Sequence, residues 1–419
     1  MDTKNQVLTF LQKYSMAPEN IDLHSCTMAF CRELQAGLEG KESSLMMIPT
    51  YISPRCGSLV GKTAIAIDAG GTNMRTALVS FTETGAVISD FELSPMPGTE
   101  TRISRRDFYD AVIARIEPLA GKADSIGFCF SYPAEILPNR DARVIRFNKE
   151  VRIDDSEGMI LCAPLKERFA DKAFVVLNDT VAAQLGSDSG LAADIGFILG
   201  TGTNTCYSEK GENIKKLPGT TGKMIINTES AGFDKFPLGE FERRFDETTA
   251  IPGDHLYEKA VSGAYHSGII YLTALQAGKD GLLDSKTLAA IEACGGFNGV
   301  EVDEFARNPD GNGKIASLSS TEQDREVLYH IVDCAMERAA RLVTANLAGV
   351  MLQADLGKDS PAVISAEGST FLKSFLLRPK VEQYIKSYIE QQLGRRCVFV
   401  TGRDVNLVGA AAAAIIAGN

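Results

Sequence analysis

Residues 64–81 read AIAIDAGGTNMRTALVSF, and this stretch decides how the rest of the chain is interpreted. Two apolar runs flank a short glycine turn, a pattern that predicts a β-hairpin. The turn also carries a carboxylate, Asp68, then paired glycines and, just beyond them, Arg75. Glycines let the backbone approach a phosphate, and a carboxylate beside it can hold magnesium directly or through water. A phosphate site is therefore one interpretation, and a plain tight turn is the other.

The composition is that of a globular protein with more than one core. The chain has 419 residues, 44% of them apolar and 23% charged, and this length favours two domains. The net charge of −11 argues against a nucleic-acid partner or an anionic membrane surface, because both need a dense positive face. A local basic pocket for phosphate groups is compatible with this charge.

Cysteine and histidine usage bears on compartment and metal content. The nine cysteines and four histidines are scattered, without a C-x-x-C pair, which favours a reduced cytosolic protein without a structural zinc site. Residues 1–15 lack a long apolar core, and no apolar run is long enough to span a bilayer. We therefore expect a cytoplasmic protein without a membrane segment.

The opening pattern occurs a second time along the chain. An apolar run at 195–199 breaks at Gly-Thr-Gly-Thr-Asn (200–204), and further strands follow at 205–208 and 223–227. Two copies predict two α/β lobes whose turns converge on a cleft, a favoured place for ligands. The alternative is that any α/β chain has glycines at its strand ends. Helical periodicity predicts helices at 5–15, 19–38, 105–119, 158–171, 254–277, 322–353, 380–393 and 405–417.

Other segments carry polar groups at predicted strand ends. Asn178-Asp179 opens a loop after a buried strand, where Asp179 is suited to accept a proton from a hydroxyl nucleophile; a helix N-cap is the bland alternative. Lys149 can neutralise a moving phosphate, although single lysines are usually solvated. Glu229 and Glu258 can recognise a polyol by bidentate hydrogen bonds, although Glu258 alone also fits a helix surface.

Two further patterns bear on nucleotide and metal binding. Gly-Ser-Thr at 368–370 follows a strand and can bring backbone close to a nucleoside, whereas the chain has no Walker A sequence and matches G-x-G-x-x-G poorly. Residues 308–315 resemble the first half of a calcium loop, but Ser319 stands where a bidentate Glu belongs. We interpret that segment as an exposed turn, and the five alanines at 410–414 as close helix packing.

The motifs in this order resemble the hexokinase and glucokinase family of the eukaryotic type, over nearly the whole chain. The segments that carry the resemblance are SLMMIPTY (44–51), DAGGTNMR (68–75), FCFSYP (128–133), Asn148-Lys149, LNDT (177–180), LGTGTN (199–204), NTE (227–229), PGDHLYEK (252–259) and EGST (367–370).

The resemblance implies an ATP-dependent hexokinase that phosphorylates the 6-hydroxyl of a hexose, glucose above all. The implied fold is the two-lobed, actin-like ATPase (ribonuclease H-like) fold with an active-site cleft between its lobes. The implied catalytic pair is Asp179, as base, and Lys149. The implied sugar contacts are Ser131, Asn148, Lys149, Asn178, Asp179, Asn204, Glu229 and Glu258. The implied ATP contacts are Asp68 (with Mg²⁺, through water), Gly70, Gly71, Thr72, Asn73, Arg75, Thr201, Gly202, Thr203, Gly368 and Ser369.

Three departures from the family pattern concern binding, and none removes a charged residue that the chemistry needs. Asn148 stands in place of Thr, residues 230–233 (SAGF) replace a Trp-Gly-Ala-Phe run, and Ala366-Glu367 replace the usual residues before the adenosine glycine. We expect a small domain formed by 61–178 plus 403–419, a large domain at 179–402, and an N-terminal helical segment, 1–60, on the large domain. The protein is expected to be a monomer or a homodimer.

Two other functions fit the same fold. One is a sugar-binding regulator that barely catalyses, which would not need Asp179 and Lys149. The other is an actin-like ATPase that acts on a partner protein, which would not need the sugar contacts. The retained residues favour the kinase.

Overall fold

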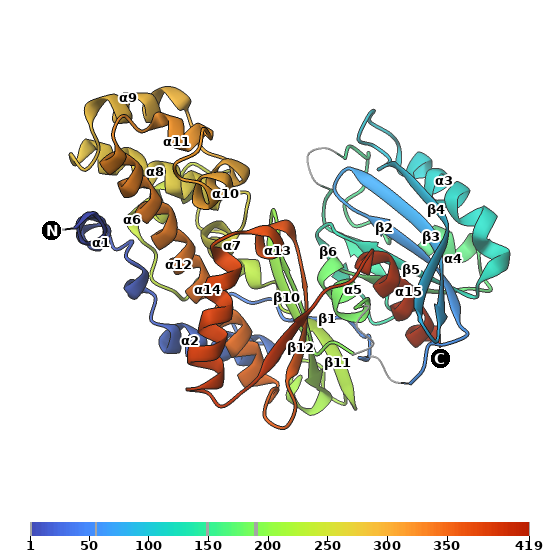
Figure 1. Ribbon diagram of the computed structural model, residues 1–419. Coiled ribbons are helices and arrows are strands. Elements are labelled where there is room, and N and C mark those ends of the chain that lie inside the picture. Colours follow the sequence, from blue (N-terminus) through green and yellow to red (C-terminus); the bar gives the residue numbers. More distant parts are fainter. Residues whose placement is uncertain (1, 55–56, 148–150, 188–191, 419) are drawn as a thin grey trace.

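The chain folds into two lobes, each built around one β-sheet (Figure 1). The structure is a computed structural model, and it describes residues 2–54, 57–147, 151–187 and 192–418. The smaller lobe holds a five-stranded sheet and the larger lobe a six-stranded one. None of the described helices is long and apolar enough to cross a membrane.

The sheet of the smaller lobe has the order β4-β3-β2-β5-β8. The opening hairpin supplies its antiparallel part, and β5 and β8 add to β2 in parallel. Residues 64–67 and 69 are fully or almost fully buried, because helices cover both faces of this sheet. The strands are β2 (Thr63–Ala69), β3 (Asn73–Thr82), β4 (Gly85–Pro95), β5 (Ser125–Phe130) and β8 (Ala173–Leu177), with a separate small hairpin of β6 (Ala134–Ile136) and β7 (Ala142–Val144).

The sheet of the larger lobe repeats this plan, as the sequence predicts. An antiparallel hairpin, β9–β10, is again extended by a third antiparallel strand, β11, and on the other side by a parallel strand, β12. The sheet order is β1-β11-β10-β9-β12-β13. Its strands are β1 (Ile48–Pro49), β9 (Ile195–Leu199), β10 (Thr203–Lys210), β11 (Lys223–Asn227), β12 (Ala362–Glu367) and β13 (Cys397–Val400).

Two helices, α5 (Asp179–Leu185) and α15 (Val405–Gly418), pack closely against each other; α15 covers the sheet of the smaller lobe, and α5 lies mainly against the sheet of the larger lobe. Residues 410–414 are almost completely buried. A Cβ on Gly127 of β5 would collide with the Ala410 carbonyl, and one on Gly409 with the Ala182 carbonyl. Small side chains are therefore required for this approach, which confirms the packing interpretation of the alanine run.

The remaining helices divide between the lobes (Figure 1). In the larger lobe α2 packs along the long helix α12, and their contact forms a core beneath β9 and β12. The division of the chain at 61–178 plus 403–419 and 179–402 stays a prediction. The helices are α1 (Thr3–Lys13), α2 (Leu23–Leu38), α3 (Arg105–Ile116), α4 (Ala163–Arg168), α6 (Glu240–Asp246), α7 (Leu256–Val261), α8 (His266–Lys279), α9 (Ser285–Cys294), α10 (Gly299–Arg307), α11 (Lys314–Leu318), α12 (Glu322–Gln353), α13 (Ser369–Lys373) and α14 (Leu377–Tyr384).

Two helix predictions are wrong in extent. The single helix expected at 254–277 is interrupted between α7 and α8. The break occurs because Gly263 leaves the helix and donates its N–H to the Gly200 carbonyl at 2.8 Å. The helix expected at 158–171 shortens to α4, which has Pro164 in its first turn. The calcium-like segment is a turn leading into α11, and the described residues contain no cluster of three or more acidic, His or Cys side chains suited to a metal.

Candidate active site

The first glycine turn, between β2 and β3, is open. Residues 71–73 are exposed, and a Cβ on Gly71 would meet no atom within 4 Å. The turn is held from behind, where the Tyr132 hydroxyl donates to the carbonyl oxygens of Gly70 (2.6 Å) and Gly71 (3.0 Å). Its outer surface is therefore accessible to a ligand.

Asp68, at the base of this turn, is buried and fully engaged. Arg75 donates to Asp68 Oδ2 from Nε at 2.8 Å, and Asn406 of α15 donates to Oδ1 at 3.3 Å. Arg75 also pairs with Asp404, just before α15, at 3.2 Å. Asp68 and Arg75 thus join the turn to the start of the C-terminal helix, and both oxygens of Asp68 already have a donor.

The second glycine turn, between β9 and β10, is packed between neighbours. The Gly200 carbonyl accepts from the Gly263 N–H and from the Thr370 hydroxyl, both at 2.8 Å. The Thr203 N–H donates to Glu258 Oε2 at 3.0 Å. A Cβ on Gly368, which has φ +99°, would collide with the Leu199 backbone. The second turn and the segment after β12 therefore lie in direct contact.

A cavity of about 690 Å³ opens beside this contact. Thr201, Ser369 and the start of α10 line it. Its volume falls in the range of small-molecule sites, about 300 to 1,000 Å³. His266 also lines it, and burial lowers the pKa of this imidazole to about 4, so that it is neutral at physiological pH.

Four polar side chains form a connected cluster at the ends of β8, β10 and β11. Asn204 Nδ2 lies 2.8 Å from Asn227 Oδ1, 3.2 Å from Glu229 Oε1 and 3.5 Å from Asn178 Oδ1. Asn227 Nδ2 in turn donates to Glu229 Oε1 at 2.6 Å. Such a set of amides and a carboxylate suits a ligand with several hydroxyl groups.

Asn227 is missing from the residues that the sequence assigns to the site. The sequence reasoning singles out Glu229 from the Asn-Thr-Glu run but leaves Asn227 as the end of a strand. Because alternate residues of a strand share a face, Asn227 and Glu229 are expected on the same side. This spacing of two is the signal that could have found Asn227.

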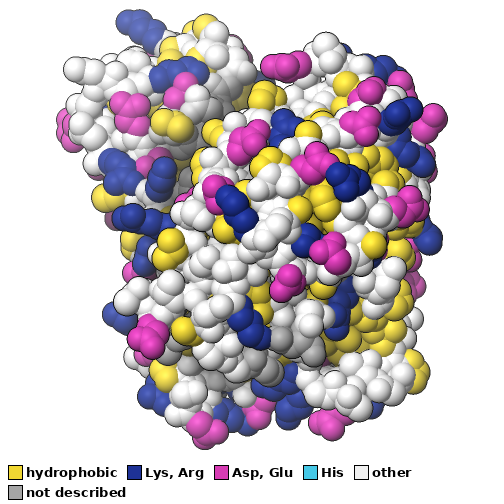
Figure 2. Space-filling model, turned by 90° about the vertical axis from the view of Figure 1, so that its right-hand side faces the viewer, with side chains coloured by type: hydrophobic (Ala, Val, Ile, Leu, Met, Phe, Trp, Pro, Cys, Tyr) yellow, Lys and Arg dark blue, Asp and Glu magenta, His cyan; other side chains and the backbone are white. Residues whose placement is uncertain are grey.

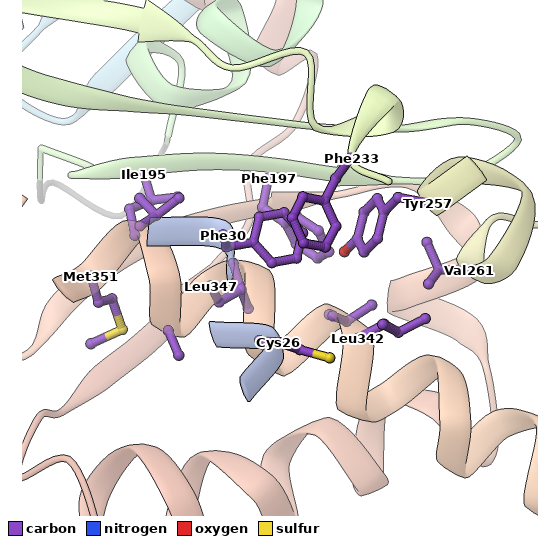
Figure 3. Close-up of a cluster of buried hydrophobic side chains, with 14 of the residues drawn as sticks. Cys26, Phe30, Ile195, Phe197, Phe233, Tyr257, Val261, Leu342, Leu347 and Met351 are labelled. Carbon is purple, nitrogen blue, oxygen red and sulfur yellow. The ribbon is translucent and has the colours of Figure 1, made fainter. Parts of the chain in front are cut away.

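The backbone after Glu229 is fixed by the core of the larger lobe. Glu229 has a left-handed conformation, φ +53°, which is uncommon for a residue with a side chain. Four residues later, Phe233 stacks on Phe30 of α2 with ring centroids 3.5 Å apart, and the buried Tyr257 meets Phe30 edge-on (Figure 3). The aromatic packing holds a conformation that a free loop would rarely adopt.

Asp179 lies between the cluster and the first turn. It is the first residue of α5, and its Oδ1 accepts from the Thr180 N–H at 2.8 Å. Burial, and then the nearby Asp68 carboxylate, raise the pKa of Asp179, while hydrogen bonds from Thr180 and Ser131 oppose the rise. Burial likewise raises the pKa of Glu229, and the charge of Asp179 contributes. The alternative of a helix N-cap at Asn178-Asp179 is confirmed for Asn178, which is the N-cap of α5. Asp179 is the first residue of that helix.

Apart from the residues of the first turn, the structure brings most of the expected residues that it describes together in two groups. Ser131, Asn178, Asp179, Asn204 and Glu229 form one group, whereas Gly368 and Ser369 lie with Thr201 beside the cavity. Glu258 contacts the second turn and not the amide cluster. Asn148 and Lys149 lie outside the described residues.

Asp68, at the base of the first turn, is the residue that the sequence proposes as the magnesium contact. Among the described residues no group of three or more His, Cys, Asp or Glu could hold a metal by itself. This fits Mg²⁺, which keeps several waters and binds through one or two carboxylates plus substrate phosphates. Because Arg75 and Asn406 occupy both oxygens of Asp68, the fit is with a contact through water.

Comparisons with known proteins identify the family. The Hexokinase family models match residues 7–188 and 194–416, which together span almost the whole chain. The chain is 28% identical to human Hexokinase-3 over 95% of its length, and it spans about half (46%) of that relative. It is 27% identical to Hexokinase-1 of Schizosaccharomyces pombe, covering 93% of this chain and 86% of the relative.

Solved structures agree in fold. A hexokinase from Schistosoma mansoni complexed with glucose superposes with a TM-score of 0.77 at 19% identity, covering 100% of this chain and 99% of the other. A second hexokinase crystal structure gives 0.80 at 20% identity, covering 99% and 100%. These matches confirm the expected two-lobed, actin-like ATPase fold. From the two family models and the fold together, the chain belongs to the hexokinase family.

Proposed function

We propose that this protein transfers the γ-phosphoryl group of ATP to the 6-hydroxyl of a hexose, with glucose as the first candidate. The observation that carries the proposal is the position of Asp179, between the polar cluster and Asp68 at the first glycine turn. An acceptor held by the cluster would place a hydroxyl at this carboxylate. A donor held at the turn would face it from the other lobe.

Asp179 is the base in this proposal. The hydroxyl oxygen of the sugar forms a bond to the γ-phosphorus, the bond from that phosphorus to the bridging oxygen of ADP breaks, and the hydroxyl proton passes to Asp179. A raised pKa makes the carboxylate a better proton acceptor than an exposed aspartate. Ser131 holds its orientation by hydrogen bonding to the carboxylate.

The polar cluster is the proposed sugar site. Asn178, Asn204 and Glu229, with Asn227 added by the structure, present donors and acceptors to ring hydroxyls. Hydrogen bonds within the cluster fix these side chains before a sugar arrives, which reduces the entropy lost on binding. Asn148 and Lys149 keep the sugar and phosphate roles that the family resemblance implies, as proposals without structural support.

The two turns are the proposed donor site. Residues 70–73 and 201–203 would surround the phosphates, and the cavity lined by Thr201 and Ser369 would hold the nucleoside. Ser369 lines this cavity, and Gly368 directly precedes it in the chain. Asp68 would hold Mg²⁺ through water, and the ion, when bound, neutralises the charge of the phosphates.

An ADP-coupled assay of the purified protein with MgATP tests the proposal. Glucose, mannose, fructose, glucosamine and N-acetylglucosamine are offered in turn, and sugar phosphate is identified in the product. We expect phosphorylation of at least one of them and little ADP without sugar. No product from any sugar, with sugar binding intact, would favour a regulator; rapid ADP release without sugar would favour an ATPase that acts on a protein.

A further inference from the structure

The amide of Asn204 is held in one orientation within the polar cluster. Its Oδ1 accepts the backbone N–H groups of Thr205 at 2.7 Å and of Ser230 at 3.3 Å. Its Nδ2 faces oxygen atoms, Asn227 Oδ1 at 2.8 Å and Glu229 Oε1 at 3.2 Å. A reversed amide would place its NH₂ group against two N–H donors and its oxygen against two acceptors. The two backbone N–H groups therefore decide which way Asn204 presents its donors.

A buried network behind the cluster holds the two residues that carry these N–H groups. Thr205 Oγ1 accepts from the Ser230 hydroxyl at 3.4 Å and from Nδ2 of Asn346, in α12, at 2.7 Å. The Thr205 carbonyl accepts from the N–H and the hydroxyl of Thr228, at 3.0 and 2.6 Å. All four side chains are at most 1% exposed. Because water cannot replace a lost partner at such depth, each contact affects the position of the others.

Asn346 enters this network from outside the polar cluster. Its Nδ2 also lies 3.4 Å from the Tyr257 hydroxyl of α7. The helix that carries Asn346 packs along α2 in the core of the larger lobe. Asn346 thus connects Thr205, beside the cluster, to a helix that the core fixes in place.

The network also bears on a departure from the family pattern. Ser230 stands in place of the Trp of the Trp-Gly-Ala-Phe run, directly after Glu229. The Ser230 side chain is almost completely buried and bonds to Thr205, so its hydroxyl is directed away from solvent. A hydrogen-bonded support therefore stands where the family pattern has an aromatic side chain.

We propose that Asn346 is a positioning residue for the sugar, because it fixes, through the Thr205 hydroxyl, the backbone N–H groups that orient Asn204. The sugar then meets an amide that is already turned toward it, and binding does not have to order that side chain. Without the Asn346 amide, the buried Thr205 hydroxyl loses a partner and Asn204 loses its fixed orientation. This inference rests on the proposed function, in which the polar cluster binds the sugar.

The test measures sugar affinity in variants that remove the contact from either side. Asn346→Leu keeps a similar volume without the donor, and Thr205→Val keeps the shape without the hydroxyl. Calorimetry gives the dissociation constant of glucose, or of the best sugar of the assay above. We expect each variant to weaken sugar binding about 10-fold. The double variant should show about the same factor and not the product of the two, because both changes remove one contact.

Two further measurements separate positioning from general loss of stability. Asn346→Leu should raise the KM for the sugar and leave kcat nearly unchanged, the pattern of a lost binding interaction. Thr344→Val is the matched control, because Thr344 is completely buried in the same helix and its hydroxyl donates to the Ala340 carbonyl at 2.8 Å. It should keep the sugar affinity of the unaltered protein. Melting temperatures confirm folding, and Thr205→Val carries the test if Asn346→Leu is unfolded.

Some outcomes overturn the inference and leave the proposed function intact. Unaltered sugar affinity in both Asn346→Leu and Thr205→Val would do so, as would multiplied factors in the double variant. An equal loss of sugar affinity in Thr344→Val would also overturn it, because a general loss of stability would then explain the effect. An unaltered protein that binds no sugar would instead remove the proposed function on which the inference rests.

Discussion

The two glycine turns hold the same place in their lobes but differ in what surrounds them. Residues 71–73 of the first turn are exposed, and its contacts come from behind, through Tyr132. In the second turn, the backbone groups of Gly200 and Thr203 are hydrogen-bonded to Gly263, Thr370 and Glu258. The first turn is thus open on its outer side, whereas the second is held between Glu258 and residues beside the cavity.

The same pattern of a glycine turn between two strands thus occurs in an open and in a tightly packed environment. No protein atom requires glycine at 71 in the first turn, because a Cβ there would meet none within 4 Å; in the proposed function, the approach of a phosphate accounts for it. Glycine is needed around the second turn so that the protein can approach itself, at Gly202 and at Gly368. Substitutions in the two turns should therefore fail in different ways.

The largest effect should come from Asp179, the carboxylate between the polar cluster and the first turn. We expect Asp179→Asn to lower kcat by about 10²- to 10⁴-fold, the usual contribution of a general base, while glucose still binds. Steady-state kinetics and calorimetry measure the two quantities. A variant with unaltered kcat would show that Asp179 is not the base.

A paired substitution compares the turns directly. Gly368→Ala places a Cβ against the Leu199 backbone at φ +99°, and we expect it to lower the free energy of unfolding by about 1 to 3 kcal/mol. The Cβ of Gly71→Ala would point into open space, so this variant should change the free energy of unfolding by less than about 0.5 kcal/mol. We expect it to lower only the affinity for nucleotide. Urea denaturation of both variants checks this. Equal destabilisation would contradict the contrast between an open turn and a packed one.

A smaller effect is expected from Asn227 in the polar cluster, which lies outside both turns. Asn227 is buried and bridges Asn204 and Glu229, so Asn227→Ala leaves buried polar groups without a partner, which costs about 1 to 3 kcal/mol. We expect sugar affinity to fall roughly 10-fold or more, with nucleotide affinity in the absence of sugar unchanged. Calorimetry with each ligand separates the two. A loss confined to nucleotide binding would place Asn227 on the donor side.

The smallest effect concerns pH and stability. The folded protein raises the pKa of Asp179, so the folded state binds this proton more tightly than the unfolded chain. The charged carboxylate therefore destabilises the fold at neutral pH, and this cost disappears as the pH falls below the ordinary Asp pKa of about 3.9.

Asp179→Asn should remove that cost. We expect a gain of about 0.5 to 2 kcal/mol at pH 7, as found where activity and stability oppose each other, shrinking as the pH is lowered. Asp107 is the matched control, because hydrogen bonds from Ser104 lower its pKa and Asp107→Asn should lose stability at pH 7. Urea denaturation across pH measures both variants, and a loss for Asp179→Asn at neutral pH would contradict the assigned direction.

Much of the fold follows from the sequence because its decisive signals are local. Glycine turns between apolar runs predict both hairpins, and the repeat of 64–81 at 195–208 predicts the second lobe. The break between α7 and α8 escapes local reasoning, because Gly263 leaves the helix to bind Gly200, which lies far away in the chain. The helices α9, α10 and α11 escape for a related reason: they pack into a common core with α8 and α12.

The candidate site shows the same limit. The sequence identifies Asp179, Glu229 and the turns from residue types at strand ends. It cannot show that Asp68 is shared by Arg75 and Asn406, since Asn406 lies in the last helix. Nor can it show that Glu258 lies against Thr203. Such contacts depend on how distant segments meet.

The surface of the smaller lobe carries charged side chains of both signs. Basic and acidic side chains are interspersed on the face shown in Figure 2. Among the residues visible there, the basic side chains form no single dense positive stripe of the kind that a nucleic-acid surface requires. The predictions above accordingly concern the turns and the cluster.

The most direct measurement follows ADP and sugar phosphate together, with and without glucose, in one time course of the unaltered protein with MgATP. The account predicts equal amounts of ADP and glucose 6-phosphate when glucose is present. It also predicts only slow ADP formation when glucose is absent, because the hydroxyl that Asp179 deprotonates is then missing. Rapid ADP formation without sugar, or ADP formed in the presence of glucose without sugar phosphate, would contradict it.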